Sequence, residues 1–474
     1  MNIILIYSDT FRIDHLGCYG NNWISTPNLD KLAKESVIFD KAYTASFPTV
    51  PNRMDLITGR FSFVRYDWQP LPKNEVILSE ILENTGYTTM LIADTPHILE
   101  NGYNFDRGFS GWKWVRGQEA ERYMTDPIEV KLPCHPDKLR NPEAVKKYLR
   151  NTSLRRSEAD YFVAQTMTEA VKWLERNYRQ EKFFLYVDTF DPHEPWDPPK
   201  WYVDRYDPDY EGEEVIYPLY GPANYLTNKE LKHVQALYAG EVTMVDRWIG
   251  MLLRKIEDLG LLDNTTIIFT TDHGYYLGEH NLIGKSLITA EFHANTPLYE
   301  EVAHIPLLIR LPKTHKKFRS SALVQPPDLT ATMIDLAKAE DPGTLQGRSL
   351  VPILKDKESF CRDFAVSSPS LIHGTAGAVR PTITDGEYSF IYTGSSPMEL
   401  GTKYETKAVN GISRKLKSIG KVENELYHLL SDPKQKNNIF AKHKDIAKKL
   451  HSKFFNFLKE VGMSEENSKW WQSL

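Results

Sequence analysis

The sequence predicts an α/β fold with a large, mostly parallel central sheet that helices cover on both faces, plus a smaller C-terminal α+β domain with an antiparallel sheet. Three observations predict it. Short apolar runs alternate with segments of helical periodicity through residue 365. Polar residues follow the apolar runs directly, as they do at the ends of buried parallel strands. Beyond residue 365, short alternating segments and turns replace this pattern. We therefore expect two domains, residues 1–365 and 366–474.

The strands of the larger domain are expected in order along the chain. Residues 2–8 are an apolar run that stops at an aspartate. Helix-plus-strand units follow at residues 26–44, 76–94, 159–190 and 242–274. Polar groups stand at four strand ends, namely Asp9, Asp94, His193, Asp272 and His273. Ligand sites of open α/β sheets form at that edge, so we expect a site there, with ordinary loop polarity as the alternative.

The remaining segments differ in composition. Residues 101–160 and 197–225 are rich in Trp, Tyr and Pro and are expected to be irregular insertions beside the site. Their aromatic residues suit sugars, aryl groups and core packing alike. In the smaller domain, residues 365–370, 376–394 and 423–432 are expected to be short strands with turns, and residues 445–462 a closing amphipathic helix.

Composition narrows the class of protein. Lys+Arg number 58 against 63 Asp+Glu, which gives a net charge of −5. The chain therefore lacks the excess of basic residues that is typical of nucleic-acid binding. No apolar run approaches the ~18 residues of a membrane span. The three cysteines are far apart in the sequence, so free thiols and a reducing compartment are expected. With no signal-like N-terminus, these features predict a cytoplasmic protein; they do not indicate its oligomeric state.

The stretch TTDHG carries the strongest metal-ligand signal. Asp272 and His273 are adjacent at a strand end, and carboxylate oxygen and imidazole nitrogen are both usable ligands. Asp9, at the end of another strand, can complete the set. The alternative is that Asp272 caps the next segment and His273 is an ordinary surface histidine. We expect one divalent ion, and these donors are compatible with Ca²⁺, Mg²⁺, Mn²⁺ or Zn²⁺.

A helix is expected to begin near Val50. Pro51 suits its first turn, and Thr49 stands about where an N-cap residue would be. The free N–H groups at such a helix start attract an anion, and Arg53, one turn further, can point to the same anion. An ordinary threonine cap, which stabilises a helix by ~1 kcal/mol, explains the same residues without any function.

Several longer motifs occur together and in order. They read DHLGCYGN, TPNLDKLA, TVPNR followed by LITGR, DPHEPW, TTDHGYYLGEHNLIGK, EEVAHIPLLIR and ELYHLLSDPKQKNNI. Over nearly the whole chain this series resembles the sulfatase family of the alkaline phosphatase superfamily. The Asp, Asp, His metal set is most similar to the branch that contains phosphonate monoester hydrolases and choline sulfatases. Many sulfatases instead have a second aspartate at Thr10 and an asparagine at His273.

The resemblance implies a nucleophile at Thr49, with one departure. In the family a Cys or Ser opens the C/S-x-P-x-R motif and is oxidised to formylglycine; here the motif begins with threonine. Because the threonine Cβ carries a methyl group, no formylglycine is expected. A threonine ester also lacks the second hydroxyl that expels sulfate, so water must attack the intermediate. That step is easier at phosphorus than at sulfur. The metal would activate the hydroxyl, with Thr49 as a possible fourth ligand.

The resemblance also implies roles for other side chains. His193 is expected to protonate the leaving alcohol, and Lys285, like Arg53, to neutralise developing charge. Where many sulfatases have a GKWH-like segment, this chain reads ADTPH, so Thr95 and His97 are candidate substrate contacts. Arg116 is another, although a surface salt bridge accounts for it equally well. His280 fits a structural role better. Simpler interpretations of His193, Lys285 and His97 are hydrogen-bonded histidines and a solvated lysine.

These residues predict a metal-dependent hydrolase that cleaves sulfate esters or the analogous phosphate or phosphonate esters of a small anionic substrate. One alternative is a phosphodiesterase or phosphonate monoester hydrolase with a threonine nucleophile. The other is a non-catalytic protein that kept the fold and binds an anion. Neither nucleic acid nor a membrane is an expected partner.

Overall fold

The computed structural model describes residues 1–288, 292–313, 317–375, 378–394, 405–407, 413–416 and 423–474. Its largest sheet has the strand order β12-β2-β13-β7-β1-β5-β3-β4, and β14 also pairs with β2. The strands are β1 (Asn2–Ser8), β2 (Val37–Tyr43), β3 (Thr88–Ala93), β4 (Gly111–Trp114), β5 (Phe183–Thr189), β7 (Thr265–Thr270), β12 (His304–Ile305), β13 (Leu307–Arg310) and β14 (Phe318–Val324).

The centre of this sheet is parallel, as predicted. Strand β1 lies between β5 and β7 and runs parallel to both. Tyr7 lies opposite Asp188 on one side and Thr270 on the other, so the three chains reach the same edge in register. The residues that follow β1 and β7 therefore meet at that edge, beside the last residues of β5.

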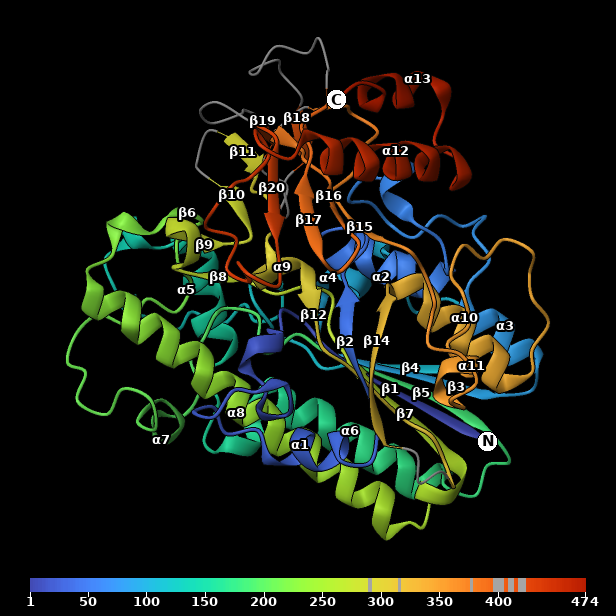
Figure 1. The fold of residues 1–474 in the computed structure, drawn as a ribbon. Coiled ribbons are helices and arrows are strands. Elements are labelled where there is room, and N and C mark those ends of the chain that lie inside the picture. The colour runs from blue at the N-terminus through green and yellow to red at the C-terminus, as the bar shows by residue number, and fades with distance from the viewer. Residues whose placement is uncertain (289–291, 314–316, 376–377, 395–404, 408–412, 417–422) are drawn as a thin grey trace.

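Helices cover both faces of the sheet (Figure 1). Strand β1 shows why, because its side chains alternate between two apolar cores: Ile4 and Ile6 belong to one and Ile3 and Leu5 to the other. The first core is completed by α1 (Pro27–Ala33), α6 (Phe162–Asn177) and α8 (Asn228–Asp258). The second is completed by α2 (Thr49–Thr58), α3 (Leu78–Asn84), α10 (Pro326–Ala337) and α11 (Val351–Leu354).

Helix α8 begins fourteen residues before the expected helical segment at residues 242–261. A capping box starts it: the Thr227 hydroxyl accepts from the Glu230 N–H, and the Glu230 carboxylate accepts from the Thr227 N–H. The T-x-x-E spacing of this box was visible in the sequence. The helix therefore begins three residues after the second aromatic insertion ends.

The two insertions are irregular for most of their length, with a few short elements. The first contributes edge strand β4 and α5 (Pro142–Asn151), and the second α7 (Lys200–Val203) and β6 (Gly221–Pro222). Strand β6 joins a small sheet with β8 (Tyr276–Leu277) and β9 (Leu282–Gly284). Two further short helices are α4 (Pro96–Leu99) and α9 (Glu300–Ala303).

A small antiparallel sheet lies in the C-terminal part, as predicted. It has the order β15 (Ala365–Ser367), β16 (Thr382–Thr384), β17 (Tyr388–Ile391) and β20 (Glu425–His428), and α12 (Lys444–Glu460) and α13 (Glu465–Ser468) lie beside it (Figure 1). Its core includes Phe61 and Phe63 from the larger part. The division at residue 365 stays a prediction. Residues 376–377 of a predicted strand segment lie outside the described residues.

One further sheet joins distant segments. Strands β10 (Ser286–Ile288) and β11 (Phe292–Asn295) pair with β18 (Glu405–Lys407) and β19 (Ser413–Leu416), and β11 runs parallel to β19. Strand β10 follows Lys285 directly. The C-terminal part therefore contacts the segment that carries a predicted site residue.

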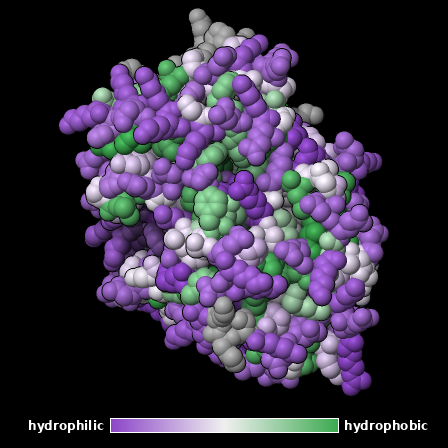
Figure 2. Space-filling model, turned by 45° about the vertical axis from the view of Figure 1, so that its right-hand side comes forward, coloured by the Kyte–Doolittle hydropathy of each residue, from purple (hydrophilic) through white to green (hydrophobic). Residues whose placement is uncertain are grey.

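Hydrophilic side chains cover most of the face in Figure 2, and hydrophobic ones form small separate groups there. Among the described helices, none is long and apolar enough to cross a membrane. Cys18, Cys134 and Cys361 are free thiols, as expected, while the cytoplasmic location stays a prediction.

Candidate active site

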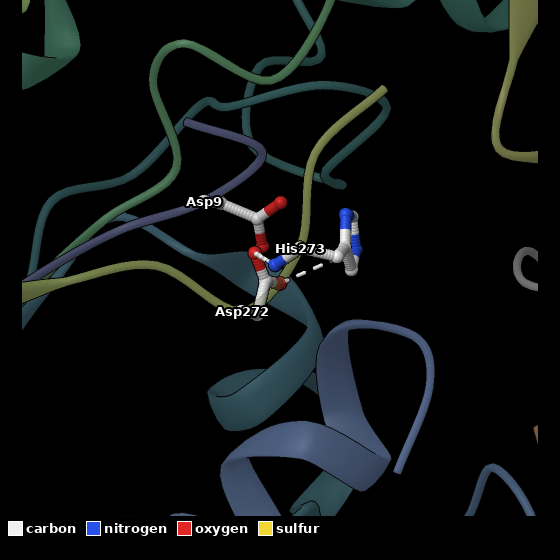
Figure 3. Close-up of side chains that lie close together, drawn as sticks. All are labelled: Asp9, Asp272 and His273. Atoms are coloured by element: carbon white, nitrogen blue, oxygen red, sulfur yellow. Dashed lines mark hydrogen bonds and ion pairs between the residues drawn. The ribbon is translucent and has the colours of Figure 1, made fainter. Parts of the chain in front are cut away.

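Two carboxylates and an imidazole converge where β1 and β7 end (Figure 3). Asp9 follows β1, Asp272 and His273 follow β7, and all three are fully buried. One ligand atom from each lies within 4.8 Å of the others. The parallel register of β1 and β7 produces this arrangement, and it is the set that the sequence predicted as metal ligands.

Thr10 holds the two carboxylates in place. Its hydroxyl donates to Asp9 Oδ1 at 2.7 Å, and its backbone N–H donates to Asp272 Oδ1 at 2.9 Å. The backbone of Thr10 has φ +60°, a left-handed conformation that non-glycine residues adopt at a cost. Where many sulfatases have a second aspartate, this residue therefore connects two candidate metal ligands.

Arg53 binds three carboxylates at once. From α2, its Nη1 lies 3.0 Å from Asp9 and 2.8 Å from Asp272, while Nε and Nη2 bind both oxygens of Asp188 at 2.7 and 2.8 Å. Asp188 also accepts from the hydroxyl of Thr95 at 2.6 Å. Sequence reasoning missed Asp188, although an aspartate within the apolar run of β5 was a signal.

The charges of this cluster fit a divalent cation. Three buried carboxylates share one arginine as their ion-pair partner, so the cluster has a surplus of acidic groups. Burial and the neighbouring Asp272 raise the pKa of Asp9 well above its usual range. Burial also disfavours the charged form of Asp272, but His273, Arg53 and Lys285 together hold its pKa below the ordinary value. Asp9 Oδ2 faces Arg53 without a well-aligned donor, so an acceptor remains for a cation.

Helix α2 begins at Thr49, one residue earlier than expected, and Pro48 is its N-cap residue and makes no side-chain cap bond. The Thr49 hydroxyl is thus not used as a cap. Lys285 Nζ donates to it at 3.4 Å. The side chain of Asn52 joins α2 to the segment after β7, because its Nδ2 donates to the backbone oxygen of Asp272 at 3.1 Å.

Lys285 lies among three predicted site residues. Besides Thr49, its ammonium is 3.0 Å from His193 Nε2 and 3.2 Å from His273 Nε2. Each imidazole has Nδ1 beside a backbone carbonyl, at 2.7 Å for His193 and 2.9 Å for His273. A carbonyl only accepts, so both Nδ1 atoms carry hydrogen and both Nε2 atoms are free to accept or to bind a metal.

Both histidines are held neutral. Burial lowers the pKa of His273 to about 3, with Lys285 adding to the effect against the opposing charge of Asp272. Burial, Lys285 and Arg140 lower the pKa of His193 well below its usual range. At neutral pH the Nε2 atom of each ring is therefore unprotonated and can accept a hydrogen bond.

A second charged network lies behind His193. Glu194 has its carboxylate 3.2 Å from His193 Nδ1 and accepts a hydrogen bond from Tyr220. Arg140 lies 3.4 Å from Glu194 and 2.7 Å from Glu119, and His97 pairs with Glu119 at 3.0 Å. Glu119 and Arg140 come from the first aromatic insertion and Tyr220 from the second. The sequence analysis did not identify Glu119, Arg140 or Glu194.

Three other residues that the sequence analysis considered, His97, Arg116 and His280, lie among protein side chains. His97 is part of the second network, and its ring packs edge-on against Phe190, which stacks on His193. Arg116 pairs with Glu121 and lies over Trp114 and Tyr123, with 42% of its side chain exposed. His280 stacks on Tyr299 and lies 3.4 Å from Glu301, which agrees with a structural role.

Comparison with known proteins now decides the family. Residues 1–339 match the sulfatase family. The chain belongs to the sulfatase family. Within the alkaline phosphatase superfamily, it is a hydrolase that acts on ester bonds. Sulfatases generally use a divalent metal ion, and Asp9, Asp272 and His273 are a possible site for it.

Three similar proteins illustrate the range of the family. An arylsulfatase of Clostridium perfringens is 28% identical over 414 residues, 77% of this chain and 80% of that one. A phosphonate monoester hydrolase of Agrobacterium radiobacter shares the fold with a TM-score of 0.72 at 20% identity, covering 97% and 95% of the two chains. A protein solved in complex with its substrate D-glucosamine-2-N,6-O-disulfate has a TM-score of 0.71 at 22% identity and covers 99% of both chains.

Proposed function

We propose that this sulfatase cleaves phosphate or phosphonate esters, or sulfate esters, with Thr49 as the nucleophile. The observation that supports this most directly is the position of the Thr49 hydroxyl. It lies at the start of α2, 3.4 Å from the ammonium of Lys285, and Lys285 in turn contacts His193 and His273. A hydroxyl, a buried cation and a neutral base thus form one continuous chain.

Asp9, Asp272 and His273 would hold the divalent ion, which polarises the oxygens of the bound ester and lowers the pKa of a coordinated hydroxyl. Arg53 keeps the two carboxylates in register and pairs with Asp188. The start of α2 and Lys285 stabilise the negative charge that develops on the transferred group.

The protein side chains carry the proton through both steps. Thr49 Oγ1 attacks phosphorus or sulfur and gives its proton to Lys285, while Lys285 passes one proton to His193 Nε2 and stays positively charged. The bond to the alcohol breaks, and His193 returns the proton to the departing oxygen. Water then attacks the Thr49 ester, His193 takes a proton from it, and the Thr49 hydroxyl regains that proton as the anion leaves.

Threonine itself favours phosphorus esters. It cannot provide the formylglycine hydrate whose second hydroxyl expels sulfate, so the covalent intermediate must be opened by water. Attack of water on a phosphoryl centre is the easier of the two reactions. Sulfate esters are the second candidate, because the family and the arylsulfatase relative favour them.

A matched set of aryl esters tests the proposal. We would assay metal-loaded protein on p-nitrophenyl sulfate, bis-p-nitrophenyl phosphate and p-nitrophenyl phenylphosphonate, with Thr49→Ala and Thr49→Ser as variants. We expect turnover of the phosphorus esters that Thr49→Ala lowers by roughly 10³-fold or more, while Thr49→Ser retains a large part. Sulfate turnover alone would favour the second candidate. Turnover that Thr49→Ala leaves unchanged would show that Thr49 is not the nucleophile.

A further inference from the structure

A buried carboxylate stands on the far side of His193 from the reacting groups. Glu194 is fully buried, and His193 is 3% exposed. Glu194 Oε2 lies 3.2 Å from His193 Nδ1 and makes no hydrogen bond within the described part of the chain. Glu194 Oε1, in contrast, accepts from the hydroxyl of Tyr220. One oxygen is thus fixed by a neutral donor, and the other is left facing the imidazole.

The backbone and side chain of Glu194 act on the same nitrogen. Its carbonyl oxygen accepts from His193 Nδ1 at 2.7 Å, which sets the tautomer and directs Nε2 toward Lys285. Phe190 stacks on the ring with centroids 4.0 Å apart and fixes its plane. His193 therefore meets a cation at one nitrogen and a carboxylate at the other.

We propose that Glu194 is a positioning residue that stabilises the protonated form of His193 during ester cleavage. This rests on the proposed function, in which His193 takes a proton from the Thr49 hydroxyl by way of Lys285 and then returns it to the leaving oxygen. While the proton is on His193, two positive charges lie 3.0 Å apart. Glu194 Oε2, at 3.2 Å, is the nearby charge that offsets their repulsion.

The surroundings of Glu194 explain why this charge is available. Burial raises the pKa of Glu194, while Arg140, Lys285 and the hydroxyl of Tyr220 favour its ionised form. Beyond Arg140 lie Glu119 and His97, which are paired with each other. Tyr275 also lies close enough to interact with Glu194. Arg140 is shared between Glu119 and Glu194, so its charge only partly offsets that of the Glu194 carboxylate.

The test compares Glu194→Gln and Glu194→Asp with Glu241→Gln. Glu241 is a second buried glutamate, on α8, whose charged neighbours are Asp191, Asp197 and Arg155. We would record the pH profile of kcat/KM for the ester that the wild type cleaves best. In Glu194→Gln we expect kcat to fall on the order of 10–100-fold with KM within about twofold. Without the carboxylate, His193 binds its proton less tightly. The acid limb of the kcat/KM profile, where the rate rises as His193 loses its proton, must therefore move to lower pH. Glu194→Asp should recover part of the rate, and Glu241→Gln should keep the wild-type limb.

Selective ¹⁵N NMR of His193, assigned with His193→Asn, gives a readout that does not need turnover. We expect Nδ1 to carry the hydrogen in the wild type and the pKa of His193 to fall in Glu194→Gln. If Glu194→Gln and Glu194→Asp lose rate equally and neither the acid limb nor the pKa moves, Glu194 is only structural and the inference is wrong. Unchanged kcat in Glu194→Gln overturns it as well. If the wild type cleaves no ester while the NMR shift occurs, the proposed function fails and the pairing of Glu194 with His193 stands.

Discussion

The two halves of the site that flank Thr49 differ in how their charges are balanced. The acidic half contains Asp9, Asp188, Asp272 and Arg53, and the basic half contains His193, His273 and Lys285. In the acidic half one cation is shared among three carboxylates. In the basic half one cation faces two neutral imidazoles and the Thr49 hydroxyl.

The two cations of the site therefore differ in role, which the sequence motifs alone do not show. Arg53 is fully engaged by protein carboxylates, so its charge maintains the architecture of the acidic half and leaves a surplus that suits a metal ion. Lys285 touches neutral groups, so its charge remains for an anionic substrate. Removing these charges one at a time separates their effects on stability, on metal binding and on rate.

The largest expected effect is on stability, from Arg53→Met. This change leaves three buried carboxylates without their shared cation, which typically costs about 3–5 kcal/mol of unfolding free energy. Urea unfolding of metal-free protein measures it. Adding a divalent metal should restore part of the loss in Arg53→Met, because the ion supplies positive charge to the same carboxylates. A loss below about 1 kcal/mol would mean that the carboxylates of the acidic half are protonated or solvated.

Lys285→Met should show the opposite behaviour. The ammonium contacts neutral groups and acts on Asp272 only at longer range, so its removal should lower the unfolding free energy less than the removal of Arg53 does. The rate should fall on the order of 10²–10³-fold, as it does when a charge-stabilising donor is removed. Steady-state assays of kcat and KM measure this, with Lys285→Arg as the charge-retaining control. Strong destabilisation with an unchanged rate would contradict the assignment of the two halves.

The candidate metal ligands, which include two members of the acidic half, were predictable from the sequence for a physical reason. Parallel strands bring their C-terminal ends to one edge, so the positions of Asp9, Asp272 and His273 after predicted strands were enough to group them. Asp188 was missed because it lies inside β5, one residue before the strand ends, where periodicity marks only a buried strand. The start of α8 was missed although Thr227 and Glu230 form a recognisable capping box.

The network behind His193 could not be predicted in the same way. Glu119, Arg140 and Tyr220 come from irregular insertions, where no repeating geometry connects spacing in the sequence to distance in space. Their contacts depend on the tertiary path of the chain. The resemblance to sulfatases located Thr49, His193 and Lys285, and the structure brings these three together. Their roles remain predictions.

Asp9→Asn tests the metal-binding side of the comparison, with a moderate expected effect. The loss of one ligand and one negative charge should weaken divalent metal binding by at least about 10–100-fold. Calorimetric titration of metal into chelator-treated protein measures this. As a matched control, Thr10→Val removes only the hydroxyl that donates to Asp9 and should give a smaller loss. Equal affinity in Asp9→Asn and wild type would exclude Asp9 as a ligand.

The same variant should alter how the stability of metal-free protein depends on pH. Burial and Asp272 raise the pKa of Asp9 in the folded state, so the folded protein binds its proton more tightly than the unfolded chain does. Metal-free wild type should therefore lose stability as pH rises from the unfolded pKa through the raised folded pKa of Asp9. Asp9→Asn lacks this loss and should be the more stable of the two above that range. Thermal unfolding in chelator across the pH range compares them, and parallel curves would contradict the raised pKa.

The smallest expected effect is that of Arg116→Ala, which contrasts an exposed arginine with the buried Arg53. Arg116 pairs with Glu121 and lies 4.5 Å over the ring of Trp114, at 42% exposure. Such a pair, screened by solvent, contributes about 0–1 kcal/mol, so stability should change by no more than that and kcat by less than about twofold. Parallel unfolding and kinetic assays measure both quantities. A roughly tenfold increase in KM with unchanged kcat would instead place Arg116 at the substrate, which is one of the two interpretations that the sequence left open. That result would require the Arg116 guanidinium to leave Glu121 when the ester binds. The Glu121→Gln variant should then bind the ester more tightly than wild type, because the amide pairs with Arg116 more weakly than the carboxylate does.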